Sequence, residues 1–428
     1  MIHRPRFHPP PHIYPPDEWH FIQTQFMPDL LEQSETMFTL GNGYLGMRGC
    51  FEEGGPIGQN GTFINGFYES WPPEDVYGLA TTGQTIVNAT DTKIIKLSVD
   101  NEPLWLPHAT VWKFDRRLNM TAGTLDRDIL WETPAGKRVM ISSRRLVSFA
   151  HRHLAAIVYR VTLLNASAPV VLSSEMIANE PATRRTTHDP RQAKVFAEKV
   201  LQHRLSYAKD KRIVLCHATN KSGLTLACAI DHALETSCRT TWASHYTEDA
   251  GQVAATIEAE PRRPITLVKF MAYHTSHTAP PDELCARVER TLDRAVAEGA
   301  HALFVSQEQY MQDFWDRTDI SVTMDPVKAE ATTTAAQQAL RFNLFHILQA
   351  SARAENTGGP AKGLVHGFAG LRDYNCVLVF HPALPNELDC LRFELMFCGQ
   401  VLETHVGHEK LSVCPPRMLH HANTVETL

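Results

Sequence analysis

The sequence predicts a mainly β protein with a few helices, in which a large antiparallel β sandwich precedes the helices and a small β unit follows them. Between residues 19 and 273, short apolar segments alternate with Gly, Pro, Asn and Asp, which is the pattern of strands and turns. No helical segments are interleaved there, as parallel strands would require, so stacked antiparallel sheets are expected. Helical periodicity begins only after Pro280 and Pro281.

The strands of the large sandwich are predicted from eight apolar segments. Residues 1–16, rich in Pro and His, precede them and are expected to form an extended arm, because each Pro removes a backbone donor and restricts its predecessor. The eight segments, bounded by turn residues, are residues 94–100, 128–133, 137–143, 154–164, 168–176, 212–218, 224–230 and 265–273.

One hairpin can be placed residue by residue. Ile129 and Trp131 alternate with polar neighbours, residues 133–136 supply turn chemistry, and Val139 and Ile141 alternate on the return. Alternation on both arms indicates that one face of this hairpin is buried.

Helices are predicted after the sandwich. A first helix follows Pro281, with Leu284, Val288 and Leu292 at helical spacing, and it ends at Gly299. A second helix covers residues 303–317. Residues 320–325 read as a short extended linker.

A third helix is predicted over residues 334–354. Its apolar side chains extend around most of its circumference, so it is expected to be buried on several sides: Leu340, Leu344, Ile347 and Leu348 form one stripe, and Phe342 and Phe345 lie off it. Beyond it, residues 376–380, 391–397, 400–406 and 410–413 predict a small β unit.

Composition narrows the function classes. At 428 residues the chain has room for two or three domains, and its net charge of -6 gives no attraction to nucleic acid. No apolar stretch of about 18 residues is present, and no apolar segment follows the N-terminal charges, so no membrane span is expected. We therefore expect a soluble, cytoplasmic protein.

The histidines and cysteines do not predict a metal site. The 22 His residues are scattered without metal-ligand spacing, and surface composition explains them best. The nine Cys residues are odd in number and irregular in spacing, which favours reduced thiols.

Two motifs resemble a dinucleotide-binding site and a pair of catalytic carboxylates, but their sequence context supports neither function. Gly41, Gly43 and Gly46 match the dinucleotide-binding fingerprint, but more glycines follow in place of a helix, so tight turns are the better interpretation. The acid pairs do not have a spacing that selects two catalytic carboxylates and are expected to be solvated: Glu52 with Glu53, Glu74 with Asp75, and Asp126 with Asp128.

An aromatic segment at residues 63–78 leaves two readings open. Such side chains can stack on sugar rings or can pack an inter-sheet loop. The residues concerned are Phe63, Phe67, Tyr68, Trp71 and Tyr77.

Long runs of this sequence closely resemble glycoside hydrolase family 65, which includes maltose, trehalose and kojibiose phosphorylases. The runs at the N-terminal side include TMFTLGNGYLGMRGCFEEG, GTFINGFYES and residues 122–157. The likeness resumes at QQALRFNLFHILQASARAENTGGPAKGL, and residues 368–413 resemble the family's small C-terminal β-sandwich.

The resemblance implies four regions. They are a galactose-mutarotase-like super-β-sandwich over residues 1–275, a helical linker over 276–330, the remnant first helix of an (α/α)6 barrel over 331–364, and a small C-terminal β-sandwich with a tail over 365–428. In full-length relatives a long stretch separates the last two and forms nearly the whole barrel, with the general-acid Glu and the phosphate-holding residues. Phe314 and Trp315 resemble the family's sugar-contact segment but precede the barrel, so no role is carried over to them.

The function implied is that of an inverting α-glucoside phosphorylase or hydrolase that has lost its catalytic centre. In the family a Glu protonates the glycosidic oxygen while phosphate or water attacks the anomeric carbon. Without these groups we expect no catalytic residue, no metal, no cofactor and no turnover; substrate-binding residues stay unnamed.

The expected partners are glucose or an α-glucoside, with inorganic phosphate in intact relatives. A second copy of the chain is also expected, held through an exposed helix between Leu340 and Leu348. The alternative function is a non-catalytic carbohydrate-binding or protein-interaction β-sandwich.

Overall fold

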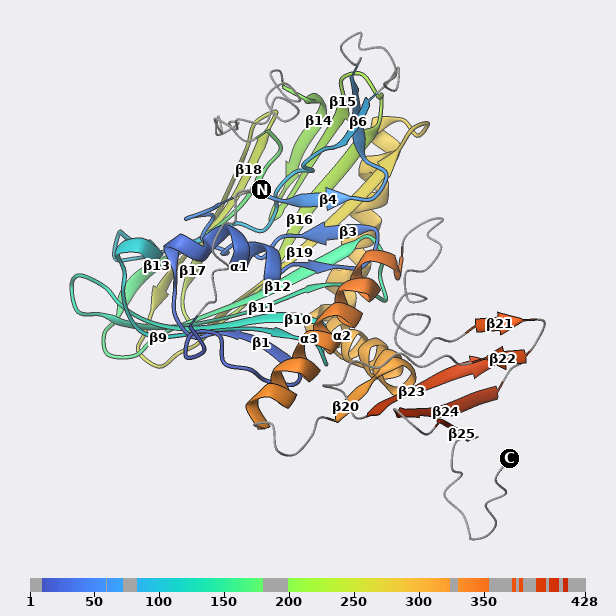
Figure 1. Cartoon of the computed structure of the whole chain (residues 1–428). Coiled ribbons are helices and arrows are strands. Elements are labelled where there is room, and N and C mark those ends of the chain that lie inside the picture. Colours follow the sequence, from blue (N-terminus) through green and yellow to red (C-terminus); the bar gives the residue numbers. More distant parts are fainter. Residues whose placement is uncertain are drawn as a thin grey trace, which may run out of the picture. The chain divides into compact units, whose positions relative to one another are not determined.

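The computed structural model describes residues 10–58, 60–71, 83–179, 199–323, 330–353, 372–374, 377–379, 390–397, 400–407 and 411–414 (Figure 1). The chain divides into two compact units. The larger is built mainly from His20–Tyr310, and the smaller contains Met311–Ile347 and the C-terminal strands.

The larger unit contains a nine-stranded antiparallel sheet. Its order follows the chain from β9 to β12 and then turns back through β19, so strands far apart in sequence become neighbours. In spatial order the strands are β1 (His20–Gln23), β9 (Thr110–Asn119), β10 (Thr124–Glu132), β11 (Arg138–Val147), β12 (Leu154–Leu163), β19 (Ile265–Ser276), β16 (Thr225–Glu235), β15 (Arg212–Thr219) and β14 (Leu201–Lys209).

A five-stranded sheet faces it. Side chains bond across the two sheets: His232 of β16 lies 2.7 Å from the Ser174 hydroxyl of β13, and Lys269 of β19 donates to the Glu175 carbonyl of β13. The predicted pair of stacked sheets is confirmed. In spatial order the second sheet is β17 (Thr240–Tyr246), β18 (Ala250–Ala259), β13 (Ala168–Ile177), β7 (Ile95–Val99) and β8 (Glu102–Pro103).

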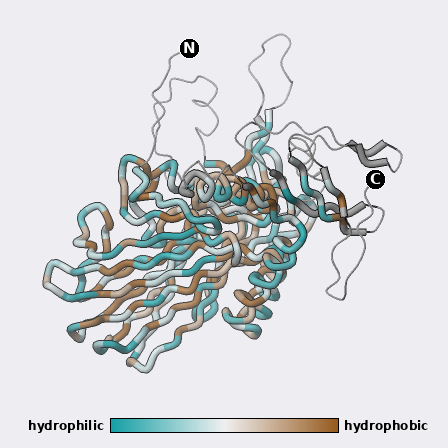
Figure 2. Tube along the Cα trace, turned by 60° about the horizontal axis from the view of Figure 1, so that its bottom comes forward, coloured by the Kyte–Doolittle hydropathy of each residue, from teal (hydrophilic) through white to brown (hydrophobic). Residues whose placement is uncertain are grey.

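The predicted hairpin is β10 and β11. Ile129 pairs with Ile141 and Trp131 with Val139, and all four side chains are buried. Gly136 closes the turn at φ 78°, where its amide donates to the Thr133 carbonyl. Hydrophobic and hydrophilic residues alternate along such strands in Figure 2, as expected for a sheet with one buried face.

Short elements connect the sheets. They are η1 (Pro28–Leu30), α1 (Leu31–Met37), η2 (Leu106–His108), the sheet of β2 (Leu40–Gly41), β3 (Leu45–Met47) and β4 (Thr62–Ile64), and the pair β5 (Tyr68–Trp71) and β6 (Gly83–Ile86). The glycine fingerprint falls on the β2–β3 turn. Asn42 accepts there from the amides of Tyr44 and Leu45, so the tight-turn interpretation is confirmed.

The predicted helices form α2 (Pro281–Thr318), which is interrupted at Gly299. Gly299 has φ 79° and ψ 161°, so two helical segments meet there, as the sequence predicts. The first segment covers the nine-stranded sheet: Leu284, Val288 and Leu292 are fully buried in one cluster with residues of β12, β15, β16 and β19.

The smaller unit contains the C-terminal strands. One sheet has the order β20 (Ser321–Thr323), β23 (Cys390–Phe397), β24 (Gln400–Gly407) and β25 (Leu411–Cys414), and β21 (Arg372–Tyr374) pairs with β22 (Val377–Val379). The four predicted C-terminal strands are confirmed. The predicted linker at 320–325 supplies the edge strand β20.

The third predicted helix is α3 (Glu330–Ser351), and the expectation that it is exposed between Leu340 and Leu348 is wrong. Leu344, Phe345 and Leu348 are 8%, 0% and 8% exposed. The helix is also held through polar contacts that the apolar pattern does not reveal. The Gln337 amide bonds Val322 N and Ile320 O at 2.8 and 2.7 Å.

Arg341 completes the attachment of α3 within the smaller unit. Its guanidinium pairs with Asp319 at 2.8 Å and Glu18 at 3.0 Å and lies 3.6 Å from the ring centre of Trp19. None of the helices in the described part of the chain is long and apolar enough to cross a membrane.

Candidate functional site

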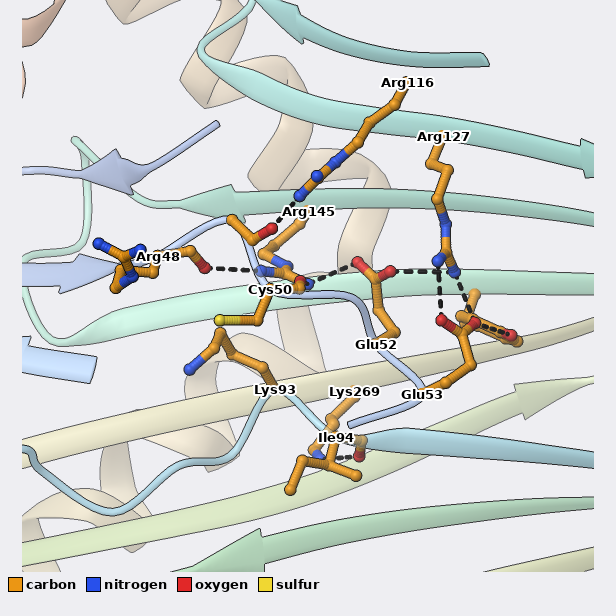
Figure 3. Close-up of polar contacts among 12 residues, drawn as sticks. Arg48, Cys50, Glu52, Glu53, Lys93, Ile94, Arg116, Arg127, Arg145 and Lys269 are labelled. Carbon is orange, nitrogen blue, oxygen red and sulfur yellow. Dashed lines mark hydrogen bonds and ion pairs between the residues drawn. The ribbon is translucent and has the colours of Figure 1, made fainter. Parts of the chain in front are cut away.

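The most concentrated set of charges lies inside the larger unit. We call Glu52, Glu53, Arg116, Arg127 and Arg145 the arginine–glutamate cluster. The two Glu residues follow β3 in a loop, and the three Arg residues come from the neighbouring strands β9, β10 and β11. Figure 3 shows the arginines directed from the sheet toward this loop. All five residues are at most 5% exposed.

Arg127 and Arg145 saturate the two carboxylates. Arg127 binds Glu53 with both terminal nitrogens, at 2.8 and 2.7 Å, and also contacts Glu52 at 3.0 Å. Arg145 donates to Glu52 at 2.6 Å and to the Cys50 carbonyl at 2.9 Å. The cluster therefore ties the loop to β10 and β11 (Figure 3).

Arg116 is held differently from the other two arginines. It donates to the Gly49 carbonyl, and its guanidinium carbon lies 4.4 Å from the ring centre of Phe38 and 4.6 Å from that of Phe51. Burial lowers the pKa of Arg116 to about 9, with Glu52 opposing the shift. The two aromatic rings and one carbonyl thus take the place of a carboxylate partner.

Glu52 remains ionised at neutral pH. Burial favours the protonated form of Glu52, but the charges of Arg127 and Arg145 outweigh it and lower the pKa to about 2. Glu53 also accepts a hydrogen bond from the Tyr159 hydroxyl at 2.9 Å. A carboxylate bound so fully by fixed donors cannot act as a proton donor, so this arrangement suits structure rather than acid catalysis.

Two buried lysines extend the charged interior. Lys93 pairs with Asp91 at 2.6 Å, and burial lowers the pKa of Lys269 to about 7. The Lys269 ammonium donates to the carbonyls of Ile94 and Glu175, at 2.9 and 2.8 Å, and so bridges the two sheets.

The expectation that Glu52 and Glu53 are solvated is wrong. That two acidic residues are adjacent in sequence does not show whether strands from distant parts of the chain cover them. A usable signal lies in the strands: Arg116 stands between Phe114 and Leu118, and Arg127 between Leu125 and Ile129, at inward positions of alternating patterns. Such arginines need buried partners, such as carboxylates or backbone carbonyls.

Other predicted residues are placed as follows. Asp128 is half-exposed and lies 4.0 Å from Lys113, in line with the expectation for a solvated acid. Asp126 departs from it: the residue pairs with Arg144 at 3.2 Å, and burial raises its pKa. In the aromatic segment Phe67 is buried, whereas Glu74, Asp75 and Tyr77 lie outside the described residues.

The histidines are not only surface composition. His217 and His232 are 0% and 5% exposed, and burial lowers the pKa of His232 to about 3. Within the described ranges no group of three or more His, Cys, Asp or Glu side chains could hold a metal ion.

Surface pockets in the described parts of the chain include two that are lined by charged side chains. One, of about 140 Å³, lies in the larger unit between the β11–β12 turn, β19 and α2; we call it the histidine–arginine pocket, after His151, Arg152, His153, His274 and Arg294 in its lining. The other, of about 210 Å³, lies in the smaller unit and includes Trp315, the residue of the segment that resembles a sugar-contact motif.

Two family models match the chain, one over most of its length and one near its C-terminal end. The model of the glycosyl hydrolase family 65 N-terminal domain matches residues 21–314, and that of the family's C-terminal domain matches residues 371–416. An uncharacterized glycosyl hydrolase of Mycobacterium tuberculosis is 36% identical over 354 residues, which cover 82% of this chain and 44% of the relative.

Two further comparisons agree with this family. The α,α-trehalose phosphorylase of Thermoanaerobacter brockii is 35% identical over 412 residues, covering 93% of this chain and 52% of the relative. A solved structure of a candidate kojibiose phosphorylase from the human microbiome superimposes with a TM-score of 0.67 at 18% identity, over 78% of this chain and 42% of that one, and supports the fold. The chain spans about half the length of the curated relatives that it matches. It belongs to glycoside hydrolase family 65.

Proposed function

We propose that this chain is a non-catalytic, carbohydrate-binding member of the family, related to disaccharide phosphorylases but without turnover of its own. The observation that carries the first half of the proposal is the spacing of the two domain matches. Only residues 315–370 lie between the N-terminal and C-terminal matches, whereas the relatives are about twice as long as the region they share with this chain.

This spacing bears on catalysis because of what the reaction needs. Relatives named for trehalose and kojibiose phosphorolysis act on a sugar and phosphate. An inverting attack by phosphate requires a positioned acid at the leaving oxygen and donors around the anion. We propose that residues 331–364 are the remnant of the barrel that holds these groups, between a sandwich at 1–275 with its linker at 276–330 and a second β unit at 365–428.

An exposed tryptophan supports the carbohydrate-binding half of the proposal. Trp112 is 63% exposed and lies where the β9–β10 register shifts, so its side chain turns away from the core. Its indole nitrogen donates to Glu132 at 3.2 Å, and Arg138 pairs with the same carboxylate at 2.9 Å. A fixed aromatic face beside a carboxylate and a guanidinium offers stacking and hydrogen bonds to a sugar ring.

Turnover is tested with the purified chain. Incubation with maltose, trehalose or kojibiose and inorganic phosphate should release neither glucose 1-phosphate nor glucose, while the trehalose phosphorylase of T. brockii serves as the active control. Phosphate-dependent glucose 1-phosphate from this chain would overturn the inactive half of the proposal.

Sugar binding is tested separately by calorimetric titration with maltose and glucose. We expect weak binding that Trp112→Ala abolishes and that Tyr246→Ala, at another exposed aromatic residue, leaves unchanged. If titration of the wild-type chain with maltose and glucose released no heat of binding, the proposal that it binds carbohydrate would be wrong.

A further inference from the structure

We propose that the histidine–arginine pocket binds a phosphoryl anion, either free as inorganic phosphate or carried by a sugar. This site is separate from Trp112, and the inference does not depend on the proposed function. Its lining combines the turn residues His151, Arg152 and His153 with His274 of β19. Thr291, Arg294, Ala295 and Glu298 add one face of α2.

The size of the pocket limits its ligand. A volume of about 140 Å³ lies below the roughly 300–1,000 Å³ of pockets that enclose drug-sized ligands. A phosphoryl group fits this space, and a monosaccharide attached to it would extend toward solvent. A disaccharide would not be enclosed, so this pocket is not a substitute for the family's substrate site.

The charge of the pocket favours an anion. Arg152 and Arg294 both line the pocket. The positive charges of Arg287, Arg290 and Arg294 also act on His274, which is part of the lining. Burial first, and then His153 and these arginines, lower the pKa of His274 to about 3, so that this ring is neutral. Positive potential that disfavours a further cation will attract an anion.

One carboxylate, that of Glu298, also lines the pocket. Glu298 lies 3.5 Å from His151, and Glu283 pairs with Arg287. Arg294 donates from Nε to the Arg290 carbonyl at 3.3 Å and makes no ion pair with the residues that the structure describes. The flat guanidinium can therefore present its terminal nitrogens to phosphoryl oxygens.

The remaining walls are fixed in position. The His153 and His274 rings stack with centres 3.9 Å apart, His153 donates from Nδ1 to the Tyr273 carbonyl at 3.0 Å, and His274 bonds Thr291 at 2.9 Å. Arg152 lies over the Tyr44 ring at 4.6 Å. Because these contacts already fix the two rings and Arg152, little freedom of these side chains is lost on binding.

Binding is measured by calorimetry and by the imidazole proton resonances of the full chain, titrated with inorganic phosphate, glucose 1-phosphate and glucose. Both phosphoryl compounds should bind and shift the pocket histidines, and glucose should not. A tighter complex with glucose 1-phosphate would assign the source to a sugar phosphate, and equal affinities would assign it to the phosphoryl group alone.

Variants separate this site from general anion attraction. Arg294→Gln should weaken phosphate binding at least tenfold, and Arg239→Gln, at an arginine that is 79% exposed in its side chain, should leave it unchanged. Arg294 is exposed, so its variant should fold, as circular dichroism would check. Absence of phosphate binding, or equal loss in both variants, would overturn the proposal.

Discussion

At the scale of single residues, the arginine–glutamate cluster is held together by the ion pairs of Arg127 and Arg145 with the two carboxylates. Taking charges out of water costs several kcal/mol per ion, and attraction offsets this cost only when the partners are well placed. Arg127 has three carboxylate contacts within 3.0 Å, so it is the member whose loss leaves most charge uncompensated. The cluster thus fixes the position of the 49–53 loop against three strands.

The first prediction concerns Arg127→Met. It should lower the free energy of unfolding by about 3–5 kcal/mol, because Glu53 would keep a buried negative charge without its main partner. Lys113→Met, which removes a half-exposed cation from the neighbouring strand β9, should change it by less than about 0.5 kcal/mol. Urea denaturation of both variants measures the difference, and similar small effects would contradict a stabilising role for the pair.

The second prediction is that the protein loses stability at low pH as Glu52 becomes protonated. The pKa of Glu52 is about 2 in the fold, below the ordinary value of 4.5, so between these values the unfolded chain binds more protons. The contribution of Glu52, on the order of 3 kcal/mol, is present above pH 4.5 and is lost as the pH falls toward 2.

Glu52→Gln tests this assignment. Its unfolding free energy should fall less steeply over that pH window than the wild type's, although the variant is less stable at neutral pH. Glu308→Gln, at a half-exposed carboxylate, should keep the wild-type slope. An unchanged slope in Glu52→Gln would show that other carboxylates govern acid unfolding.

At the scale of elements, α2 illustrates how a helix is both interrupted and anchored. Its first segment buries an apolar stripe on the large sheet, and the non-helical backbone of Gly299 then separates it from the second segment. At φ 79° and ψ 161° Gly299 occupies a region that is open essentially only to glycine.

The third prediction is that Gly299→Ala lowers the unfolding free energy by about 1–3 kcal/mol through backbone strain. An added Cβ would meet nothing within 4 Å at Gly299, so steric clash is not the cause. Gly46→Ala is the matched control: its Cβ also meets open space and its backbone is ordinary, so thermal unfolding should barely change. Equal tolerance of both substitutions would mean that α2 can relax at the break.

A fourth prediction tests the anchoring of the same helix. Leu292→Ala should cost about 2–5 kcal/mol, because Leu292 is fully buried in the cluster beneath α2. Val296→Ala, one turn on and 39% exposed, should cost less than about 0.5 kcal/mol. Chemical denaturation of both variants reports the contrast, which would vanish if α2 were only loosely attached to the sheet.

The elements that were predictable are those whose pattern is local. Ile129, Trp131, Val139 and Ile141 fix a hairpin because its two arms adjoin in sequence. The sequence does not predict β17. Its side chains are mostly exposed, so apolar and polar residues do not alternate along it as they do along a half-buried strand. The partnership of Glu52 with Arg127 and Arg145 joins segments 75 and 93 residues apart, and no local pattern reports such a distance.

At the scale of the whole molecule, the two family matches leave one internal region of the chain unmatched. They bracket residues 315–370, which include all of α3. The apolar pattern of this helix predicted neighbours, but it could not name them. The structure supplies some of them from the chain itself, since Gln337 and Arg341 attach α3 to residues 319–322 and to Glu18.

The fifth prediction follows from this attachment. An exposed helix would favour self-association, because it would leave large apolar side chains in water. With Leu344, Phe345 and Leu348 buried, that driving force is weakened, and we expect a monomer. Leu344→Asp should destabilise the chain, because it places a charge at a buried position, whereas Asn343→Asp at the exposed neighbouring position should not. Light scattering over a wide range of concentrations measures the oligomeric state, and thermal unfolding measures the stability of each variant. If the wild type is a dimer and Leu344→Asp is a stable monomer, the helix is an interface and the prediction is wrong.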